Sequence, residues 1–151
     1  MNRKINAIKA KQSLKHAVSH AFEVMAFLDV SESSPEERNY ENKIQIAISK
    51  PFRGSMTFFL TDGLKRRIAE NIYGEGSLLS KHSGDDCLLE ILNVIAGNFM
   101  SSYFGIHACY KMDLPLMIMT QEPPAGFLAE SFFNAEGEKF RVALCQLTEE
   151  E

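Results

Sequence analysis

One stretch, from Ser83 to Gly105, limits the folds open to this chain more than any other. Apolar residues recur there at the period of an α-helix and define one buried face, made of Leu88, Ile91, Leu92, Ile95 and Phe99. Ser83, with Asp86 three positions later, is typical of a capping box, and Gly105 is a natural C-terminal stop. The stretch therefore predicts a single long amphipathic helix.

A second line of residues follows another face of the same predicted helix. Asp86, Glu90, Asn93 and Gly97 are spaced by four, three and four positions, which brings them onto one side. The Cβ atoms of Glu90 and Asn93 are then roughly 5–6 Å apart. Gly97 is unusual, because a mid-helix glycine costs about 1 kcal/mol relative to alanine. We expect a close approach there, by the other long helix or by a partner, and the polar neighbours favour a partner.

The composition is that of an ordinary globular protein. The chain has 151 residues, 45% of them apolar and 24% charged, so we expect a single domain over 1–151. The formal net charge of −4 argues against general nucleic-acid binding. Three cysteines with no Cys-x-x-Cys pair do not suggest a disulfide framework. Residues 148–151 are expected to be a solvated acidic tail.

The N-terminal segment, residues 1–12, is basic but has no apolar core after it, so we do not expect a signal peptide. No apolar run approaches the roughly 20 residues that span a bilayer. With the cysteine pattern, these features predict a cytoplasmic protein. Whether the first helix begins within residues 4–11 is left open by the pattern.

Helical and strand patterns follow one another along the rest of the chain. The predicted helices are Ser13–Phe27, with an apolar stripe, and Leu64–Tyr73, capped by Thr61 or Asp62 and ended by Gly74. The predicted strands are Lys43–Ser49, Ser55–Leu60, Ile106–Asp113, Leu116–Thr120, Phe127–Phe133 and Lys139–Leu147. Between them, Ser31–Asn42 is predicted to be a loop, and Pro115 predicts a bulge or an edge position.

Strands that arrive as hairpin pairs favour antiparallel pairing. We therefore predict an α+β fold in which two long helices pack on one face of a mainly antiparallel sheet. The first helix also repeats the spacing of the long one, because Ser19, Glu23, Ala26 and Val30 are separated by four, three and four positions. This repeat suggests two related halves. Its first copy keeps a glutamate but has Ala26 where the second has Asn93.

The pattern Asp86-x3-Glu90-x2-Asn93-x3-Gly97 resembles the signature of the CheC/CheX chemotaxis phosphatases, which act on the phosphorylated response regulator CheY. The segments FEVMAFLDV and FRGSMTFFLT are also similar to the CheX type, and the resemblance extends over residues 13–147. Because only one copy of the motif is intact, the chain resembles CheX more than CheC. The family implies a fold of two pseudo-symmetric halves.

The resemblance implies a phosphatase that accelerates hydrolysis of the aspartyl phosphate of a CheY-type regulator. Asn93 would position the attacking water, since a carboxamide can accept and donate hydrogen bonds without adding negative charge beside the phosphoryl group. Glu90 would pair with the active-site lysine of the regulator. Gly97 would let the partner approach, whereas Asp86 is explained equally well as a helix cap.

The same resemblance implies a cofactor and partners. No cofactor is expected on this chain, and Mg²⁺ is expected on the response regulator. CheX-like proteins form homodimers, and the sequence permits one here. The alternative function is a non-catalytic interaction module that resembles the middle domain of flagellar switch proteins. Such a module would not need Asn93, so the joint presence of Glu90 and Asn93 favours the enzyme.

Polar residues on a predicted helix also have explanations without function. Any amphipathic helix exposes polar residues, so a Glu-x-x-Asn pair alone often has no function. His16 and His20, with Glu23 after them, share one helix face in an arrangement that could hold zinc. Ala17 replaces the glutamate of the metalloprotease motif, and exposed histidines are far commoner than ligands. We therefore assign no metal ligand, and the sequence leaves open whether His16 and His20 bind a metal ion.

Overall fold

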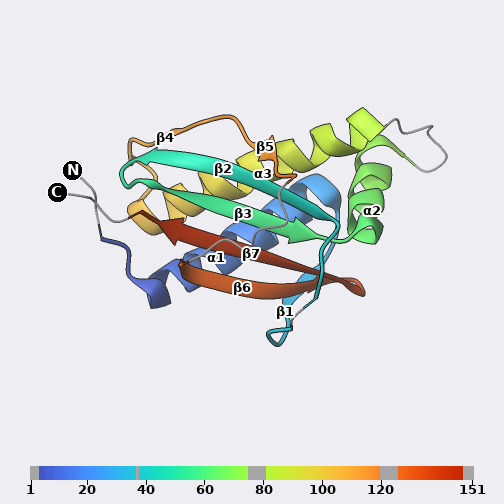
Figure 1. The fold of residues 1–151 in the computed structure, drawn as a ribbon, viewed down its shortest axis with the longest axis horizontal. Helices are drawn as coiled ribbons and strands as arrows, with labels where there is room; N and C mark the ends of the chain where they lie inside the picture. The colour runs from blue at the N-terminus through green and yellow to red at the C-terminus, as the bar shows by residue number, and fades with distance from the viewer. Residues whose placement is uncertain (1–3, 37, 75–80, 120–125, 148–151) are drawn as a thin grey trace.

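The described part of the molecule has two layers, an antiparallel sheet and, on one face of it, the helices α1 and α3 (Figure 1). The structure is a computed structural model that describes residues 4–36, 38–74, 81–119 and 126–147. Alternating apolar residues of the strands point toward the helices. The predicted α+β class, with two long helices on one face of the sheet, is confirmed.

Among the described residues the sheet has seven strands, and every neighbouring pair is antiparallel. Their order across the sheet is β1, β6, β7, β3, β2, β4, with β5 also pairing with β2. In chain order they are β1 (Val30–Glu32), β2 (Asn42–Lys50), β3 (Gly54–Leu60), β4 (Lys111–Met112), β5 (Leu116–Met117), β6 (Phe127–Ala135) and β7 (Glu138–Gln146).

The helices in the described residues are α1 (Ala7–Ala21), α2 (Asp62–Tyr73) and α3 (Lys81–Phe104), and α1 continues into a π-helical turn, η1 (Phe22–Ala26). Side-chain oxygens cap two of them. Asn6 accepts a hydrogen bond from the backbone N–H of Lys9, and Thr61 accepts one from the N–H of Leu64. The first helix therefore begins earlier than Ser13, and the predicted cap at Thr61 is confirmed.

The core lies between the sheet and α1 and α3, and the strand alternation explains its composition. Ile44 and Ile46 of β2 are fully buried, as the sequence pattern predicts. Phe140 of β7 stacks on Phe22 at a centroid distance of 4.7 Å and on Phe133 at 5.1 Å. Each such side chain contributes roughly 1.5–3 kcal/mol by its burial. This aromatic stack packs the turn η1, which follows α1, against the sheet.

The strand order relates the two halves of the chain. The first half runs α1, β1, β2, β3, and the second runs α3, an edge strand in two pieces (β4 and β5), β6, β7. β3 and β7 pair at the centre of the sheet, for example at Met56 and Leu144. Each half gives its edge strand to the hairpin of the other, because β1 pairs with β6 and β5 pairs with β2. The predicted pseudo-symmetric halves are present, with α2 added to the first.

Several sequence predictions need correction. Ser83 lies inside α3 rather than at its cap, since that helix already includes Lys81. The predicted loop Ser31–Asn42 begins with the last two residues of β1, which pair with β6. The predicted strand Ile106–Asp113 shortens to the two residues of β4. η1 ends the first helix with a π-helical turn, which no pattern in the sequence indicated.

The high hydropathy of α3 is explained by its position in the core. Over Gly84–Phe104 it is long and apolar enough to cross a membrane by length and composition. In the fold, however, its apolar face packs against α1 and the sheet, with Leu88, Ile91 and Phe99 fully buried. A core helix passes the same test, so we attribute the hydropathy of α3 to this packing.

Candidate functional site

Helix α3 carries the predicted site, and its buried face fixes how it sits. The five residues predicted for that face are all completely buried. At its N-terminal end, the Asp85 carboxylate pairs with Lys65 of α2, and both side chains are largely shielded from solvent. These contacts fix the rotation of α3 about its own axis. They therefore also fix which of its side chains face the solvent.

We call Asp86, Glu90, Asn93 and Gly97 the stripe. Its three polar members are exposed and Gly97 is partly buried, so the structure places all four on the outer side of α3. Within the described residues, no hydrogen bond or ion pair involves the side chain of Glu90 or Asn93. A carboxylate and a carboxamide one helical turn apart are therefore presented to solvent together.

Gly97 lies beside Tyr110, which comes from the segment after α3. A Cβ atom at Gly97 would have one described neighbour within 4 Å, the Tyr110 hydroxyl oxygen at 3.5 Å, which is ordinary contact. The packing of α1 against α3 thus leaves room at this position, and the helix-packing explanation of Gly97 is wrong. The structure leaves an open approach to the stripe, flanked by a tyrosine of this chain.

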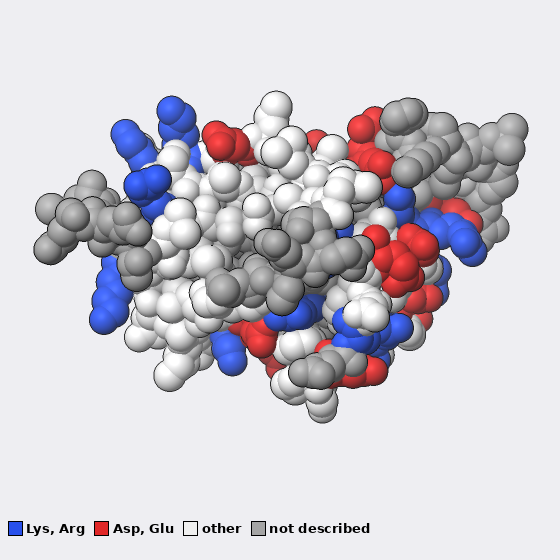
Figure 2. Space-filling view, in the orientation of Figure 1, with Lys and Arg blue, Asp and Glu red and all other residues white. Residues whose placement is uncertain are grey.

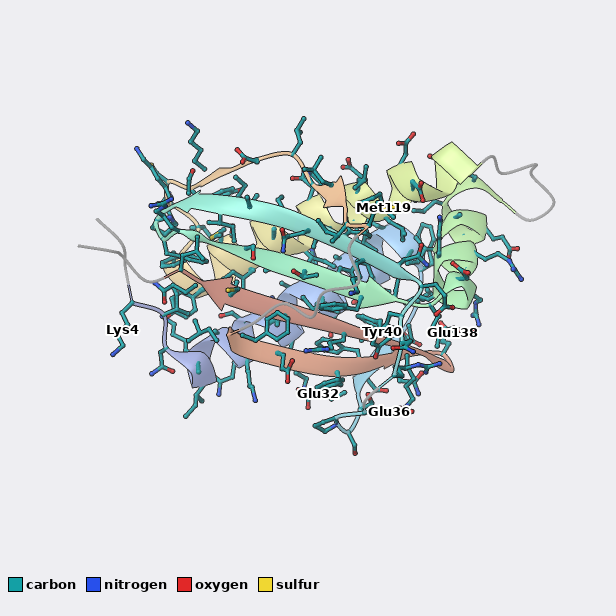
Figure 3. The ribbon with its side chains drawn as sticks, viewed as in Figure 1. Lys4, Glu32, Glu36, Tyr40, Met119 and Glu138 are labelled. Atoms are coloured by element: carbon teal, nitrogen blue, oxygen red, sulfur yellow. The ribbon has the colours of Figure 1, made fainter. Side chains whose placement is uncertain are left out.

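The segment after α3 exposes large apolar side chains, and one of them, Tyr110, lies beside Gly97 of the stripe. Tyr110 is 43% exposed, and the others are more exposed: Ile106 81%, Leu114 83%, Leu116 64% and Met119 85%. We call these five residues the apolar rim; Met119, labelled in Figure 3, is its last member. Exposed apolar patches beside polar groups mark interaction sites. The rim was not predicted from the sequence, because the pattern of Ile106, Tyr110 and their neighbours is that of a regular strand.

The first copy of the motif has a different geometry. Glu23 is exposed on η1, but Ala26, which takes the place of the asparagine, is fully buried. Its carbonyl oxygen accepts a hydrogen bond from the Asn71 side chain at 2.7 Å. The π-helical turn changes the angular spacing of residues, so a glutamate and the third residue after it do not share a face here. An asparagine at position 26 would point into the core.

The nearby thiol is not a candidate nucleophile. Cys87 follows Asp86 directly but turns inward, and burial raises the pKa of its thiol. A thiol kept protonated in this way reacts poorly. The contact with Cys87 in turn raises the pKa of the Tyr73 hydroxyl. The chemistry of the stripe must therefore come from its carboxylates and its carboxamide.

Pockets and metal ligands do not coincide with the stripe. Among the described residues no group of three or more His, Cys, Asp or Glu side chains could hold a metal ion, so His16, His20 and Glu23 do not form a three-ligand zinc site. One hollow of about 680 Å³ lies where Arg141 pairs with Glu130 and stacks near Phe132. That is the sheet face turned away from the core aromatics.

Figure 2 views the molecule from the side of that sheet face and shows acidic and basic side chains gathered at the end that carries α2. The stripe is an exposed ridge on α3, and it lines none of four hollows of about 250 to 680 Å³ among the described residues. Small-molecule sites are concave. An exposed ridge with an apolar rim beside it is instead the form of a surface that docks a macromolecule.

Comparison with known proteins identifies a family and similar folds. Residues 44–126 match the family described as chemotaxis phosphatase CheX, and this range contains the whole stripe. The fold is similar to CheX from Vibrio vulnificus, with a TM-score of 0.77 and 17% identity over 95% of this chain and 100% of that one. It is also similar to CheX from Desulfovibrio desulfuricans, with a TM-score of 0.76 and 14% identity over 92% and 99%.

A third similar structure is a complex. The CheX–CheY–BeF₃–Mg²⁺ assembly from Borrelia burgdorferi matches with a TM-score of 0.70 and 13% identity over 96% of this chain and 100% of that one. At such identities the solved structures establish the fold. Among curated protein sequences, none matches the chain significantly.

Proposed function

Because the family match covers more than half of its residues, this chain belongs to the CheX family, and we propose that it accelerates hydrolysis of the aspartyl phosphate of a CheY-type response regulator. A chemotaxis phosphatase role directed at CheY is supported by the family and by the similarity to a CheX–CheY complex. The observation that carries the residue-level proposal is the joint exposure of Glu90 and Asn93 on a helix anchored in the core, where neither side chain has a hydrogen-bond or ion-pair partner among the described residues.

Asn93 positions the attacking water in this proposal. Hydrolysis of an acyl phosphate needs a water in line with the bond that breaks, and catalysis of phosphoryl transfer is mainly positioning and electrostatics. The Asn93 oxygen accepts a proton of the water, and its NH₂ group donates to a nearby oxygen. The side chain is neutral, so it approaches a phosphoryl group without repulsion. The helix backbone, held by the buried face, supplies the rigidity.

Glu90 docks the regulator rather than acting as a base. A carboxylate next to a phosphoryl dianion is repelled by it, so a base role is disfavoured. Pairing with the active-site lysine of the regulator instead gives a charge-assisted contact one turn from Asn93. Gly97 keeps the ridge low where the partner comes near, and Asp86 extends the acidic side of the stripe. The apolar rim supplies the surface that the partner covers.

The setting of the reaction belongs to the same proposal. The Mg²⁺ ion is bound by the regulator, in keeping with the Mg²⁺ of the Borrelia complex. The chain works in the cytoplasm, where the regulator is, and as a homodimer in the manner of its family. Because only α3 carries an intact motif, each chain acts on one regulator molecule at a time.

Phosphate release from a phosphorylated CheY-type regulator tests the proposal. Asn93→Ala should lower the accelerated rate by about 10²-fold or more, the usual loss when a transition-state group is removed. Binding to the BeF₃⁻-activated regulator should stay near the wild-type value. Glu90→Ala should weaken both binding and turnover. Glu23→Ala, the matching glutamate of the first copy, is the control and should leave both unchanged.

The outcomes separate this proposal from its alternative. Near-wild-type phosphate release by Asn93→Ala would disprove the water-positioning role. If the wild-type chain binds the activated regulator without accelerating phosphate release, it is a non-catalytic interaction module. A loss in Glu23→Ala as large as that in Glu90→Ala would show that the first copy is a working site.

A further inference from the structure

A second polar feature lies on the helical layer, outside the stripe. A hollow of about 260 Å³ is lined by side chains from α1 and α3 and by the residue that follows Gly105: His16, His20, Asn98, Ser101, Ser102 and Ile106. None of the stripe residues lines it. It collects two imidazoles, one carboxamide and two hydroxyls between two helices whose positions the core fixes.

The two histidines are arranged as a pair. They are one helical turn apart on α1, with ring centroids separated by 6.4 Å and ring planes inclined by only 11°. Both side chains are exposed, and within the described residues neither ring has a hydrogen-bond partner. A nitrogen of each ring is therefore free to coordinate a cation, and imidazole is the commonest metal ligand in proteins.

The ring spacing suits a shared metal ion after a small adjustment. A zinc ion about 2.0–2.1 Å from one nitrogen of each ring lies about 3.2 Å from each ring centroid, so two rings at a tetrahedral angle have centroids roughly 5.2 Å apart. The observed spacing is wider by about 1 Å. A bound metal lies in the plane of each imidazole, so the two nearly parallel rings must also turn toward one another. Both side chains are exposed, and rotation about their side-chain torsions allows this without moving the helix.

The α3 wall of the hollow is polar and incompletely bonded. The Asn98 side-chain nitrogen is buried and has no hydrogen-bond partner among the described residues. Such groups are uncommon in folded proteins and call for a partner. The Asn98 side chain also lines the hollow, together with Ser101 and Ser102. The amide oxygen of Asn98 and the two hydroxyls are the groups on this wall that can accept hydrogen bonds from metal-bound water.

We propose that His16 and His20 form a two-histidine site for a divalent transition-metal ion such as Zn²⁺. Water completes the coordination, and the polar wall of α3 holds that water. Nitrogen ligands select Zn²⁺, Ni²⁺ or Cu²⁺ over Mg²⁺, which prefers oxygen. Glu23 is not a ligand, because the described residues contain no group of three metal-binding side chains. The site is independent of the phosphatase proposal.

Zn²⁺ titration of the full chain, by calorimetry and by thermal unfolding, tests the site. A ligand at ten times its Kd that binds only the folded state should raise Tm by about 3–6 °C in a protein of this size. Mg²⁺ at the same concentration should not change Tm. His16→Gln and His20→Gln should each weaken Zn²⁺ binding at least about tenfold, since each removes one of two protein ligands.

A matched control is available. His107→Gln removes another exposed histidine, which does not line the hollow, and should retain wild-type Zn²⁺ binding. Circular dichroism confirms that each variant is folded. The proposal is overturned if wild-type protein binds no Zn²⁺, or if the double variant His16→Gln/His20→Gln binds it as before. A Tm increase caused by inorganic phosphate but not by Zn²⁺ would show an oxyanion site instead, and would equally overturn it.

Discussion

Replacing Gly97 by alanine gives a sharp test of how the stripe is built. Glycine inside a helix is less favourable than alanine by about 1 kcal/mol, and part of the gain comes from the lower entropy of the unfolded chain. The new Cβ atom meets the Tyr110 hydroxyl oxygen at 3.5 Å, which needs no rearrangement. We therefore expect the free energy of unfolding to rise by about 0.5–1 kcal/mol. For a chain of this length that is a Tm increase of about 1–4 °C.

Thermal unfolding measures this change, and Gly54→Ala is a control of opposite sign. A Cβ atom at Gly54 would lie 2.0 Å from the carbonyl oxygen of Cys145, its neighbour on the paired strand. The two strands must separate to accept it, so we expect a loss of about 1–3 kcal/mol or more. The structure therefore predicts opposite shifts in Tm for Gly97→Ala in α3 and Gly54→Ala in β3.

Affinity for the BeF₃⁻-activated regulator completes the experiment. If Gly97 keeps the ridge low for a partner, Gly97→Ala should be more stable yet bind the regulator more weakly. A stabilised variant with undiminished affinity would remove Gly97 from the docking surface. A lowered Tm would refute the reasoning from the structure, because it would mean that the position is packed.

Four other experiments have predictable outcomes. Asn6→Ala removes the cap of α1 and should cost about 1 kcal/mol, seen as a Tm lower by about 2–4 °C. Phe27 is 69% exposed and has φ 55°, so Phe27→Gly should relieve about 1 kcal/mol of backbone strain and raise Tm. Burial raises the pKa of the Cys87 thiol, so the unfolded chain loses that proton at a lower pH than the native state does. The free energy of unfolding should therefore fall as the pH rises through about 9. In Cys87→Ala this fall should be smaller. Alkylation under native conditions should label exposed Cys109 well before Cys87.

The elements with strong local patterns were predictable. Short-range sequence patterns predict the burial of alternate isoleucines in β2 and the apolar face of α3. They also predict the cap of α2 at Thr61 and its end at Gly74. The turn between β6 and β7 was also foreseeable, since Gly137 takes the positive φ that such a turn requires. In each case the signal and its cause lie within one element.

Elements that depend on distant residues were not predictable. β1 is three residues long, too short for an alternation pattern, and exists because β6 pairs with it. The alternation of Ala108, Tyr110 and Met112 resembled a strand, but only its end finds a partner, in β2. The hydrogen-bonding opportunities of a sheet edge are set by the whole fold. Because a regular strand was predicted there, the exposure of the apolar rim was not predicted.

The candidate site also has one part that local sequence predicts and another part that depends on distant residues. The stripe follows from helical spacing alone, so the exposure of Glu90 and Asn93 could be predicted without the fold. The space around Gly97 could not, because Tyr110 reaches it only after the chain has left α3 and turned back. The pairing of His16 and His20 with a wall from α3 also required the packing of two helices.

The exchange of edge strands between the two halves has a consequence for synthesis on the ribosome. Val30 pairs with Ala135, so β1 waits for a partner until nearly the whole chain has been translated. The nascent first half therefore exposes the unpaired edges of β3 and β2 until β7 and β5 emerge. Neither half can close its own sheet, and chains severed between α2 and α3 should regain structure only when both fragments are mixed. Such interlocked fragments would form a split protein whose reassembly reports the encounter of two fused partners.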